Sequence, residues 1–350
     1  MAFINEGSFA RFTHVPWRSL RMFGYESVAQ LASDIREHIH RVPRDIDLVV
    51  GIPRSGMIPA YLIGLYVNRL VIDLETFLAN GATGHGRTRA TGAEVGEPWA
   101  ARHVLLVDDS VSSGESMRRA LGRVRSTPFS GRLTTCAAIV LPSMVKGVDL
   151  HFREMARPRV FEWNLFHHPE VENSCFDLDG VLCVDPTARE NDDGPRYLEF
   201  LSAAEPLFTP TQKIGHIVSA RLEKYRALTE AWLARHGIEY GALHLIDLPS
   251  QAERQRLGAH SSHKATIYRQ TNAFLFYESD RTQAGEIAQQ SGRPVLCTAD
   301  MQLYLPGMLG VRAGIARAAW RLRTPLYRLK GWLRPPTELG LRSNGGGSRS

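Results

Sequence analysis

The stretch "RHVLLVDDSVSSGESMRRAL" (residues 102–121) decides the fold of the first half of the chain. Four apolar residues predict a buried strand, the acids Asp108 and Asp109 follow it, and a turn rich in Ser and Gly leads into a helix. Paired carboxylates suit vicinal hydroxyls or Mg²⁺, while hydroxyls and N–H groups at a helix start suit a phosphate. The stretch therefore indicates a site for a ribose 5-phosphate.

Helical and strand patterns alternate around this stretch. The spacing predicts helices at 27–39, 58–68 and 114–125, and strands at 46–52, 103–109 and 134–141. Such alternation predicts a parallel α/β sheet whose ligands lie beyond the carboxyl ends of the strands. A second turn at such an end, "GIPRSGMIPA" (51–60), offers Arg54, Ser55 and Gly56 as a cradle for pyrophosphate.

Composition limits the class of protein. A chain of 350 residues with 43% hydrophobic content can form two domains. The four cysteines are widely spaced, which favours neither disulfides nor a zinc site and fits a reducing cytoplasm. The N-terminus lacks the pattern of a signal peptide, and no segment approaches the length of a membrane span. We expect a cytoplasmic protein.

The motifs of the first half resemble those of type I phosphoribosyltransferases, over about residues 20–168. The resemblance implies phosphoribosyl pyrophosphate as the substrate, with Mg²⁺. It implies that Asp108 and Asp109 hold the ribose hydroxyls, and that residues 53–56 form the pyrophosphate loop. The 5-phosphate would be held within 110–114 by Ser110, Ser112, Ser113 and Gly114.

The Gly-rich segment 79–96 would be a loop that closes over this site, with Arg87 and Arg89 as its pyrophosphate contacts. A solvated loop without such contacts is the alternative. Members acting on 6-oxopurines usually carry Asp at the position of Ser112, so the sequence departs from that specificity. Trp163 in "RPRVFEWNLF" is either a platform on which a base or sugar stacks or an ordinary core aromatic.

A second set of motifs starts after the polar segment "HHPEVENS" (167–174). "CFDLDGVLC" (175–183) alone also resembles a calcium loop. With Ser219, Lys264, Glu278 and Asp280 following in order, it resembles the haloacid dehalogenase superfamily over about residues 172–300. The intervals between these motifs leave no room for a full cap domain.

That resemblance implies a phosphatase. Asp177 would attack the phosphoryl group, and Asp179 would protonate the leaving alcohol and then activate water. Ser219 and Lys264 would hold the phosphoryl oxygens. Mg²⁺ would be bound by Asp177, the carbonyl of Asp179, and Glu278 or Asp280.

The net charge of +6 is concentrated at the end of the chain, because residues 301–350 carry nine Lys and Arg against the single acid Glu338. This distribution weakens a nucleic-acid-binding function for the whole protein. The basic, Trp-containing amphipathic pattern at 308–334 predicts peripheral contact with the inner face of the membrane. A helix that docks on an acidic partner or on the phosphatase domain is the alternative.

The fold class predicted is α/β, with two parallel-sheet domains and a basic amphipathic helix. We expect a phosphoribosyltransferase domain at 1–170, a haloacid dehalogenase-like phosphatase domain with a minimal cap at 171–300, a helical tail at 301–336 and a disordered end at 337–350.

The two domains together predict a bifunctional enzyme. It would transfer phosphoribosyl, with inversion, to a sugar of a lipid-linked bacterial glycan and then hydrolyse the 5-phosphate, leaving a β-ribofuranosyl group. Fusions of this kind resemble ribofuranose-installing enzymes of polysaccharide assembly. The alternatives are a nucleobase acceptor with a nucleoside as the product, and a non-catalytic sensor of phosphoribosyl pyrophosphate. The sequence does not identify the acceptor, the general base of the transfer or the oligomeric state, and it allows a homo-oligomer.

Overall fold

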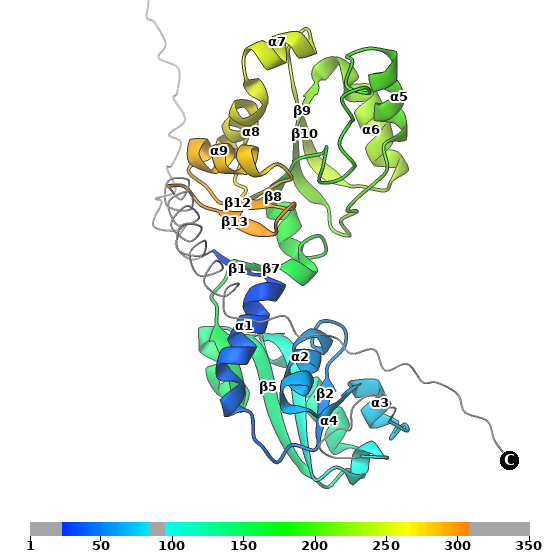
Figure 1. The fold of residues 1–350 in the computed structure, drawn as a ribbon, viewed down its shortest axis with the longest axis vertical. Coiled ribbons are helices and arrows are strands. Elements are labelled where there is room, and N and C mark those ends of the chain that lie inside the picture. The colour runs from blue at the N-terminus through cyan, green and yellow to red at the C-terminus, as the bar shows by residue number, and fades with distance from the viewer. Residues whose placement is uncertain (1–22, 84–94, 308–350) are drawn as a thin grey trace, which may run out of the picture.

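The computed structural model describes residues 23–83 and 95–307, which form two α/β units (Figure 1). The N-terminal unit is built on a five-stranded parallel sheet in the order β3-β2-β4-β5-β6. Its strands are β2 (Leu48–Gly51), β3 (Leu70–Asp73), β4 (His103–Val111), β5 (Arg132–Val140) and β6 (Leu150–Glu154). The expected parallel α/β arrangement of this half is confirmed.

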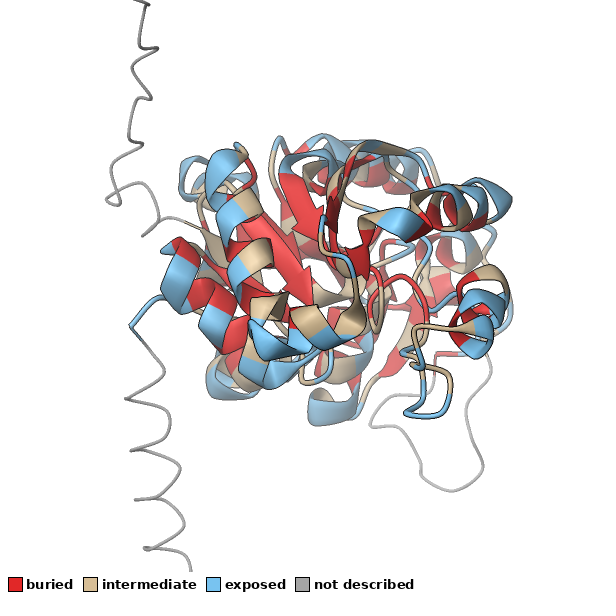
Figure 2. Cartoon of the chain, turned by 90° about the horizontal axis from the view of Figure 1, so that it is seen from above, coloured by how far each residue is buried: buried red, intermediate tan, exposed pale blue. Residues whose placement is uncertain are grey.

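Helices cover both faces of this sheet, because its central strands are apolar on both sides. Val49, Leu105 and Val107 face α1 (Val28–His38) and α2 (Met57–Val67) in one cluster. Their neighbours Val50 and Leu106 face α3 (Leu74–Leu78) and α4 (Glu115–Arg125) in another. Figure 2, in which the second unit lies nearer the viewer, shows buried strands between helices whose outer faces are exposed.

The second unit has a six-stranded sheet in the order β10-β9-β8-β11-β12-β13. Its strands are β8 (Ser174–Phe176), β9 (Ile214–Leu222), β10 (Tyr240–Ile246), β11 (Leu275–Glu278), β12 (Val295–Cys297) and β13 (Gln302–Tyr304). All pairs are parallel except β12 with β13. The structure shows a mixed α/β fold here, and the haloacid dehalogenase-like assignment stays a prediction.

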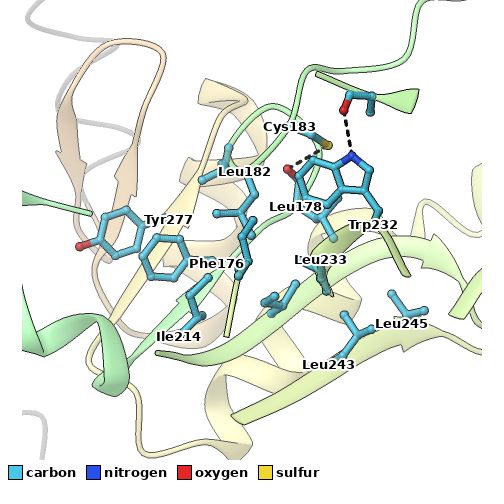
Figure 3. Packing of buried hydrophobic residues seen from close by; sticks show 14 of the residues in the cluster. Phe176, Leu178, Leu182, Cys183, Ile214, Trp232, Leu233, Leu243, Leu245 and Tyr277 are labelled. Atoms are coloured by element: carbon cyan, nitrogen blue, oxygen red, sulfur yellow. Dashed lines mark hydrogen bonds between the residues drawn. The ribbon is translucent and has the colours of Figure 1, made fainter. Parts of the chain in front are cut away.

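The helices of the second unit are α5 (Pro195–Ala203), α6 (Arg226–Arg235), α7 (Gln251–Arg256), α8 (Ala259–Gln270) and α9 (Arg281–Ser291). One core cluster joins α5 and α6 to the sheet, and another joins α8 and α9 to its other face. In Figure 3, Phe176 and Tyr277 stack beside Leu178, and Trp232 donates from its indole nitrogen to the carbonyl of Ala204 at 2.8 Å. This packing fixes the end of β8, which directly precedes Asp177, and the end of β11, whose last residue is Glu278.

A short parallel pair, β1 (Gly24–Glu26) with β7 (Arg159–Phe161), lies between the two sheets (Figure 1). The Tyr25 hydroxyl donates to the carbonyl of Met301 at 3.0 Å, and the Tyr277 hydroxyl donates to the carbonyl of Leu165 at 3.4 Å. The residues after β7 therefore pack on the second unit as well as on the first.

One predicted boundary is corrected by the structure. The helical tail was expected to begin at residue 301, but Gln302–Tyr304 forms β13, which pairs antiparallel with β12. A tight turn allows this pairing, because Met301 has a φ of 48° and Asp300 Oδ1 accepts from the backbone N–H of Gln302 at 3.2 Å. The tail from 308, the end at 337–350 and the N-terminal 22 residues lie outside the described residues.

No helix within 23–83 and 95–307 has the length and apolar character needed to cross a bilayer.

Candidate active sites

The first candidate site is built on the carboxyl end of β4. Asp108 and Asp109 are both buried there, and Asp108 Oδ1 accepts from the backbone N–H of Asp109 at 2.9 Å. Burial, followed by the neighbouring Asp109 carboxylate, raises the pKa of Asp108 to about 7. Two adjacent carboxylates in a buried place offer acceptors for ribose hydroxyls or for a divalent cation.

The turn after these acids leads directly into α4. Gly114 precedes the helix with a φ of 73°, in the left-handed region that glycine adopts without strain. Ser113 Oγ accepts from the backbone N–H of Glu115 at 3.3 Å. The backbone N–H groups at this helix start suit the negative charge of a phosphate. Residues 112–114 thus form a turn between β4 and α4, and the binding of a 5-phosphate by residues 110–114 stays a prediction.

The loop at 53–56 lies against the end of β4. Ile52 donates its backbone N–H to the carbonyl of Val107 at 2.8 Å. A Cβ at Gly56 would lie 2.5 Å from the carbonyl oxygen of Ile52 and 2.9 Å from that of Val107. Only glycine allows this approach, which brings the predicted pyrophosphate loop, with Arg54 and Ser55, beside Asp108 and Asp109.

Trp163 contacts the first site directly. Its indole nitrogen donates to Asp109 Oδ2 at 2.8 Å, and its ring stacks on Phe161 with centroids 5.0 Å apart and an interplanar angle of 9°. The indole is half-buried. Trp163 is therefore neither a fully buried core aromatic nor a ring with both faces free, because Phe161 covers one face.

Sequence reasoning missed Arg159, which is buried behind the phosphate loop. Its guanidinium donates to Ser112 Oγ at 2.8 Å and to the carbonyl of Met155 at 2.9 Å, and it lies 5.3 Å from the ring centroid of Phe161. A buried cation against a phosphate loop favours an anion there. No local motif marks Arg159, since Ser112 lies 47 residues away from it in the sequence. Arg87 and Arg89, which the sequence predicts as pyrophosphate contacts, lie outside the described residues.

The second candidate site is built on the carboxyl ends of β8, β9 and β11. Lys264, which is fully buried, donates to Asp177 Oδ2 at 2.6 Å, to Glu278 Oε2 at 2.7 Å and to Gln283 Oε1 at 3.0 Å. Burial raises the pKa of Asp177, while the Lys264 ammonium opposes that rise. The two carboxylates in turn raise the pKa of Lys264 against the effect of its burial, so the ammonium is retained.

Asp179 is held by a second residue that sequence reasoning missed. The Arg221 guanidinium, with no exposed surface, donates to both carboxylate oxygens of Asp179, the shortest distance being 2.5 Å. The Cys183 thiol donates to the same carboxylate at 3.4 Å. Arg221 lies two residues after Ser219 on β9, so both point to one face of the sheet. That spacing is a signal by which the sequence could have identified it.

A cavity of about 330 Å³ opens over these residues. The predicted Asp177, Asp179, Ser219, Lys264, Glu278 and Asp280 all line it. Asp185, Asn191, Tyr197, Arg254, His260 and Gln283, which the sequence did not single out, line it as well. Between β8 and β9 the only α-helix in the described chain is α5, and the minimal cap stays a prediction.

The donor set of this cavity suits a hard cation in part. Five carboxylates line it, against the basic groups Lys264 and Arg254. Within residues 23–83 and 95–307, however, no three His, Cys, Asp or Glu side chains converge in a way that would hold a metal. Mg²⁺ commonly binds through only one or two carboxylates, with waters and a substrate phosphate as its other ligands. Asp177 with Glu278 or Asp280 would supply those two carboxylates.

Comparison with known proteins bears on the first unit. Residues 24–168 match the family model of the phosphoribosyl transferase domain. The transcriptional regulator GfcR of Thermoplasma acidophilum is 28% identical over 152 residues, which span 43% of this chain and 71% of that protein.

Among solved structures, the purine phosphoribosyltransferase of Pyrococcus horikoshii aligns at 18% identity with a TM-score of 0.29, covering 40% of this chain and 93% of that one. The xanthine-guanine-hypoxanthine phosphoribosyltransferase of Helicobacter pylori aligns at 15% identity with a TM-score of 0.32, covering 41% and 95%. The family match supports a phosphoribosyltransferase domain at residues 24–168.

Proposed function

We propose that the protein is a bifunctional enzyme that transfers 5-phosphoribosyl from phosphoribosyl pyrophosphate to an acceptor and then removes the 5-phosphate. The observation that carries the proposal is the convergence of Asp177, Asp179, Ser219, Lys264 and Glu278 around one cavity, in a chain whose first part is a phosphoribosyltransferase domain. A transfer product bears a 5-phosphate, and a phosphatase acts on that group. Its hydrolysis makes the two-step route irreversible.

In the transfer step, the acceptor oxygen or nitrogen bonds to C1 of the ribose as the bond from C1 to pyrophosphate breaks. The loop containing Arg54 and Gly56 binds the pyrophosphate, and Asp109 with Asp108 binds the ribose hydroxyls. The acceptor approaches from the opposite, β face and inverts C1. We take Asp109, which also accepts from the Trp163 indole at 2.8 Å, as the group that receives the acceptor's proton.

In the hydrolytic step, Asp177 bonds to phosphorus as the bond from phosphorus to O5 of the ribose breaks, and Asp179 donates a proton to O5. Water then attacks the aspartyl phosphate and gives its proton to Asp179, which releases phosphate and restores Asp177. Ser219 and Lys264 hold the phosphoryl oxygens. Asp177 with Glu278 or Asp280 would hold Mg²⁺, which would supply charge neutralisation between the anionic nucleophile and the phosphate.

For the acceptor, we propose a sugar hydroxyl of a lipid-linked glycan, at the cytoplasmic face of the membrane. Ser112 supports this choice over a 6-oxopurine. Ser112 stands where members acting on 6-oxopurines usually carry Asp, and its hydroxyl accepts from Arg159 at 2.8 Å. The free face of Trp163 suits the apolar face of a sugar ring. It suits a heterocycle equally, so a nucleoside-forming enzyme is the alternative.

A non-catalytic function is a second candidate, favoured by the similarity to a protein named as a transcriptional regulator. In that case the first site would bind phosphoribosyl pyrophosphate without turnover. The buried Asp177–Lys264–Glu278 cluster argues against this function, because a sensor has no need of it.

The two functions are distinguished by product analysis. Wild-type protein is incubated with phosphoribosyl pyrophosphate, Mg²⁺ and, in separate reactions, phenyl glycosides or nucleobases, and pyrophosphate and inorganic phosphate are measured. The enzyme proposal predicts equal release of both with a glycoside. Release with nucleobases alone would support the alternative acceptor, and binding of phosphoribosyl pyrophosphate without release in any reaction would support the sensor.

A further inference from the structure

A second cavity of about 410 Å³ adjoins the cavity over Asp177, and Asp185, Ser279 and Asp280 line both. We propose that this second cavity, called the groove below, binds the group attached to C1 of the ribose in the phosphatase substrate, and that this group is an uncharged ring. The inference rests on the proposed function, because it assigns the leaving-group side of the phosphatase site.

The position of the groove carries the first step. Gly180 lines the groove and directly follows Asp179, which meets the leaving oxygen in the proposed mechanism. A Cβ at Gly180 would lie 2.2 Å from Ser279 Oγ, and its φ of 76° favours glycine, so the two segments meet closely here. Ser219 and Lys264, the phosphoryl contacts, line the first cavity but not the groove. The groove therefore begins where the leaving group emerges.

The lining of the groove indicates the chemistry of its occupant. Val184, Leu207, Phe208 and Ala299 contribute apolar surface, and Leu207 is 47% exposed. Pockets that are mostly apolar with a few hydroxyls bind the faces of rings. Thr298 and the shared Ser279 supply such hydroxyls.

The charged residues of the groove further narrow the class of ligand that it can bind. The charged residues of the groove are Asp185 and Asp280, and none of the described residues that line it is basic. Like charges repel across a partly desolvated surface. A second phosphate or another anion is therefore disfavoured, and an uncharged sugar or heterocycle fits.

Backbone hydrogen bonds fix the walls of the groove, so the walls do not need to become ordered when a ligand binds. Val184 donates its N–H to the carbonyl of Glu205 at 3.0 Å, and Leu207 donates to that of Leu182 at 2.9 Å. Phe208 stacks on Phe166, with centroids 4.2 Å apart and an interplanar angle of 6°. A wall held in this way binds a ring without an added ordering cost.

The test compares two substrates, phenyl β-D-ribofuranoside 5-phosphate and ribose 5-phosphate, in the full chain with Mg²⁺. Leu207→Ala removes apolar contact, and Ala299→Trp fills the groove from an exposed position. Leu198→Ala is the matched control, since Leu198 is 42% exposed on α5 and lines neither cavity.

We expect the wild type to have the lower KM for the phenyl riboside. Both groove variants should raise that KM roughly three- to tenfold and leave the KM for ribose 5-phosphate and the kcat unchanged. Equal effects on the two substrates would overturn the inference, as would a lower KM for a riboside 5-phosphate whose ring at C1 carries a carboxylate than for the uncharged phenyl riboside. If the wild type hydrolyses neither substrate, the proposed phosphatase activity itself is wrong and the groove assignment falls with it.

Discussion

The indole nitrogen of Trp163 donates a hydrogen bond of 2.8 Å to Asp109 Oδ2, which links an aromatic face to the carboxylate pair at the end of β4. The same indole stacks on Phe161, which ends β7 and pairs with Glu26 of β1. An acceptor that stacks on Trp163 would therefore be placed next to a ribose bound by Asp109.

Trp163→Phe tests this link, because phenylalanine keeps a ring and loses the N–H. The loss of one hydrogen bond to a carboxylate predicts a KM for phosphoribosyl pyrophosphate about five- to tenfold higher, measured by pyrophosphate release. Trp99→Phe is the control, since the Trp99 indole donates to the carbonyl of Phe77 at 2.9 Å, away from the acids. An unchanged KM in Trp163→Phe would show that the bond does not position Asp109.

Asp108 gives the free protein a pH-dependent stability. Its pKa is raised in the folded state to about 7, mainly by burial, so the folded protein retains a proton that the unfolded chain loses above its ordinary value near 3.8. This contribution is present at low pH and is lost as the pH rises through about 7. Asp108→Asn removes the buried charge.

We therefore expect Asp108→Asn to raise the Tm of the ligand-free protein at pH 8 by about 2 °C or more, and to have a smaller effect at pH 5.5. Thermal melts at the two pH values check this. An equal change in Tm at both would contradict the raised pKa.

Lys264 holds the second site together. Lys264→Met leaves Asp177 and Glu278 buried without their cation, which predicts a loss of about 3–5 kcal/mol in the free energy of unfolding. Urea unfolding measures it, with Lys213→Met, at an exposed position, as the control near zero. Unfolding of Lys264→Met at the wild-type urea concentration would show that the ion pairs contribute no net stability.

Arg221 positions Asp179 through a buried guanidinium. Arg221→Lys keeps the charge but not the paired geometry, so we predict a kcat for 5-phosphate hydrolysis lower by about 10- to 100-fold with little change in KM. Arg226→Met is the control, because Arg226 forms a more exposed ion pair with Glu223. A change confined to KM would instead place Arg221 in substrate binding.

The sequence predicted those elements whose pattern is local. Strands β2, β4 and β5 are continuous apolar runs followed by helices, and each appears where expected. Strands β1 and β7 have three residues each and pair across more than a hundred residues, so no local periodicity marks them. The antiparallel β13 was missed because the basic pattern that follows it suggested an earlier start for the tail.

The candidate sites divide in the same way. Asp108, Asp177 and Lys264 belong to local motifs, and the structure places each at a strand end or facing one. Arg159 is recognised only by its burial against Ser112, whereas Arg221, buried against Asp179, could also have been found from its spacing two residues after Ser219. Charged side chains are rarely buried unless they are paired. The burial of these two arginines, which only the structure shows, therefore indicates that they have a role at the sites.

The most direct test of the account uses Asp177→Asn with phosphoribosyl pyrophosphate, Mg²⁺ and a panel of phenyl glycosides and nucleobases, with products identified by mass. The account predicts that this variant releases pyrophosphate at the wild-type rate with a glycoside and accumulates the 5-phosphoribosylated sugar, which added wild type converts to the ribosylated sugar. Loss of both pyrophosphate release and dephosphorylation in Asp177→Asn would contradict two separable active sites in one chain.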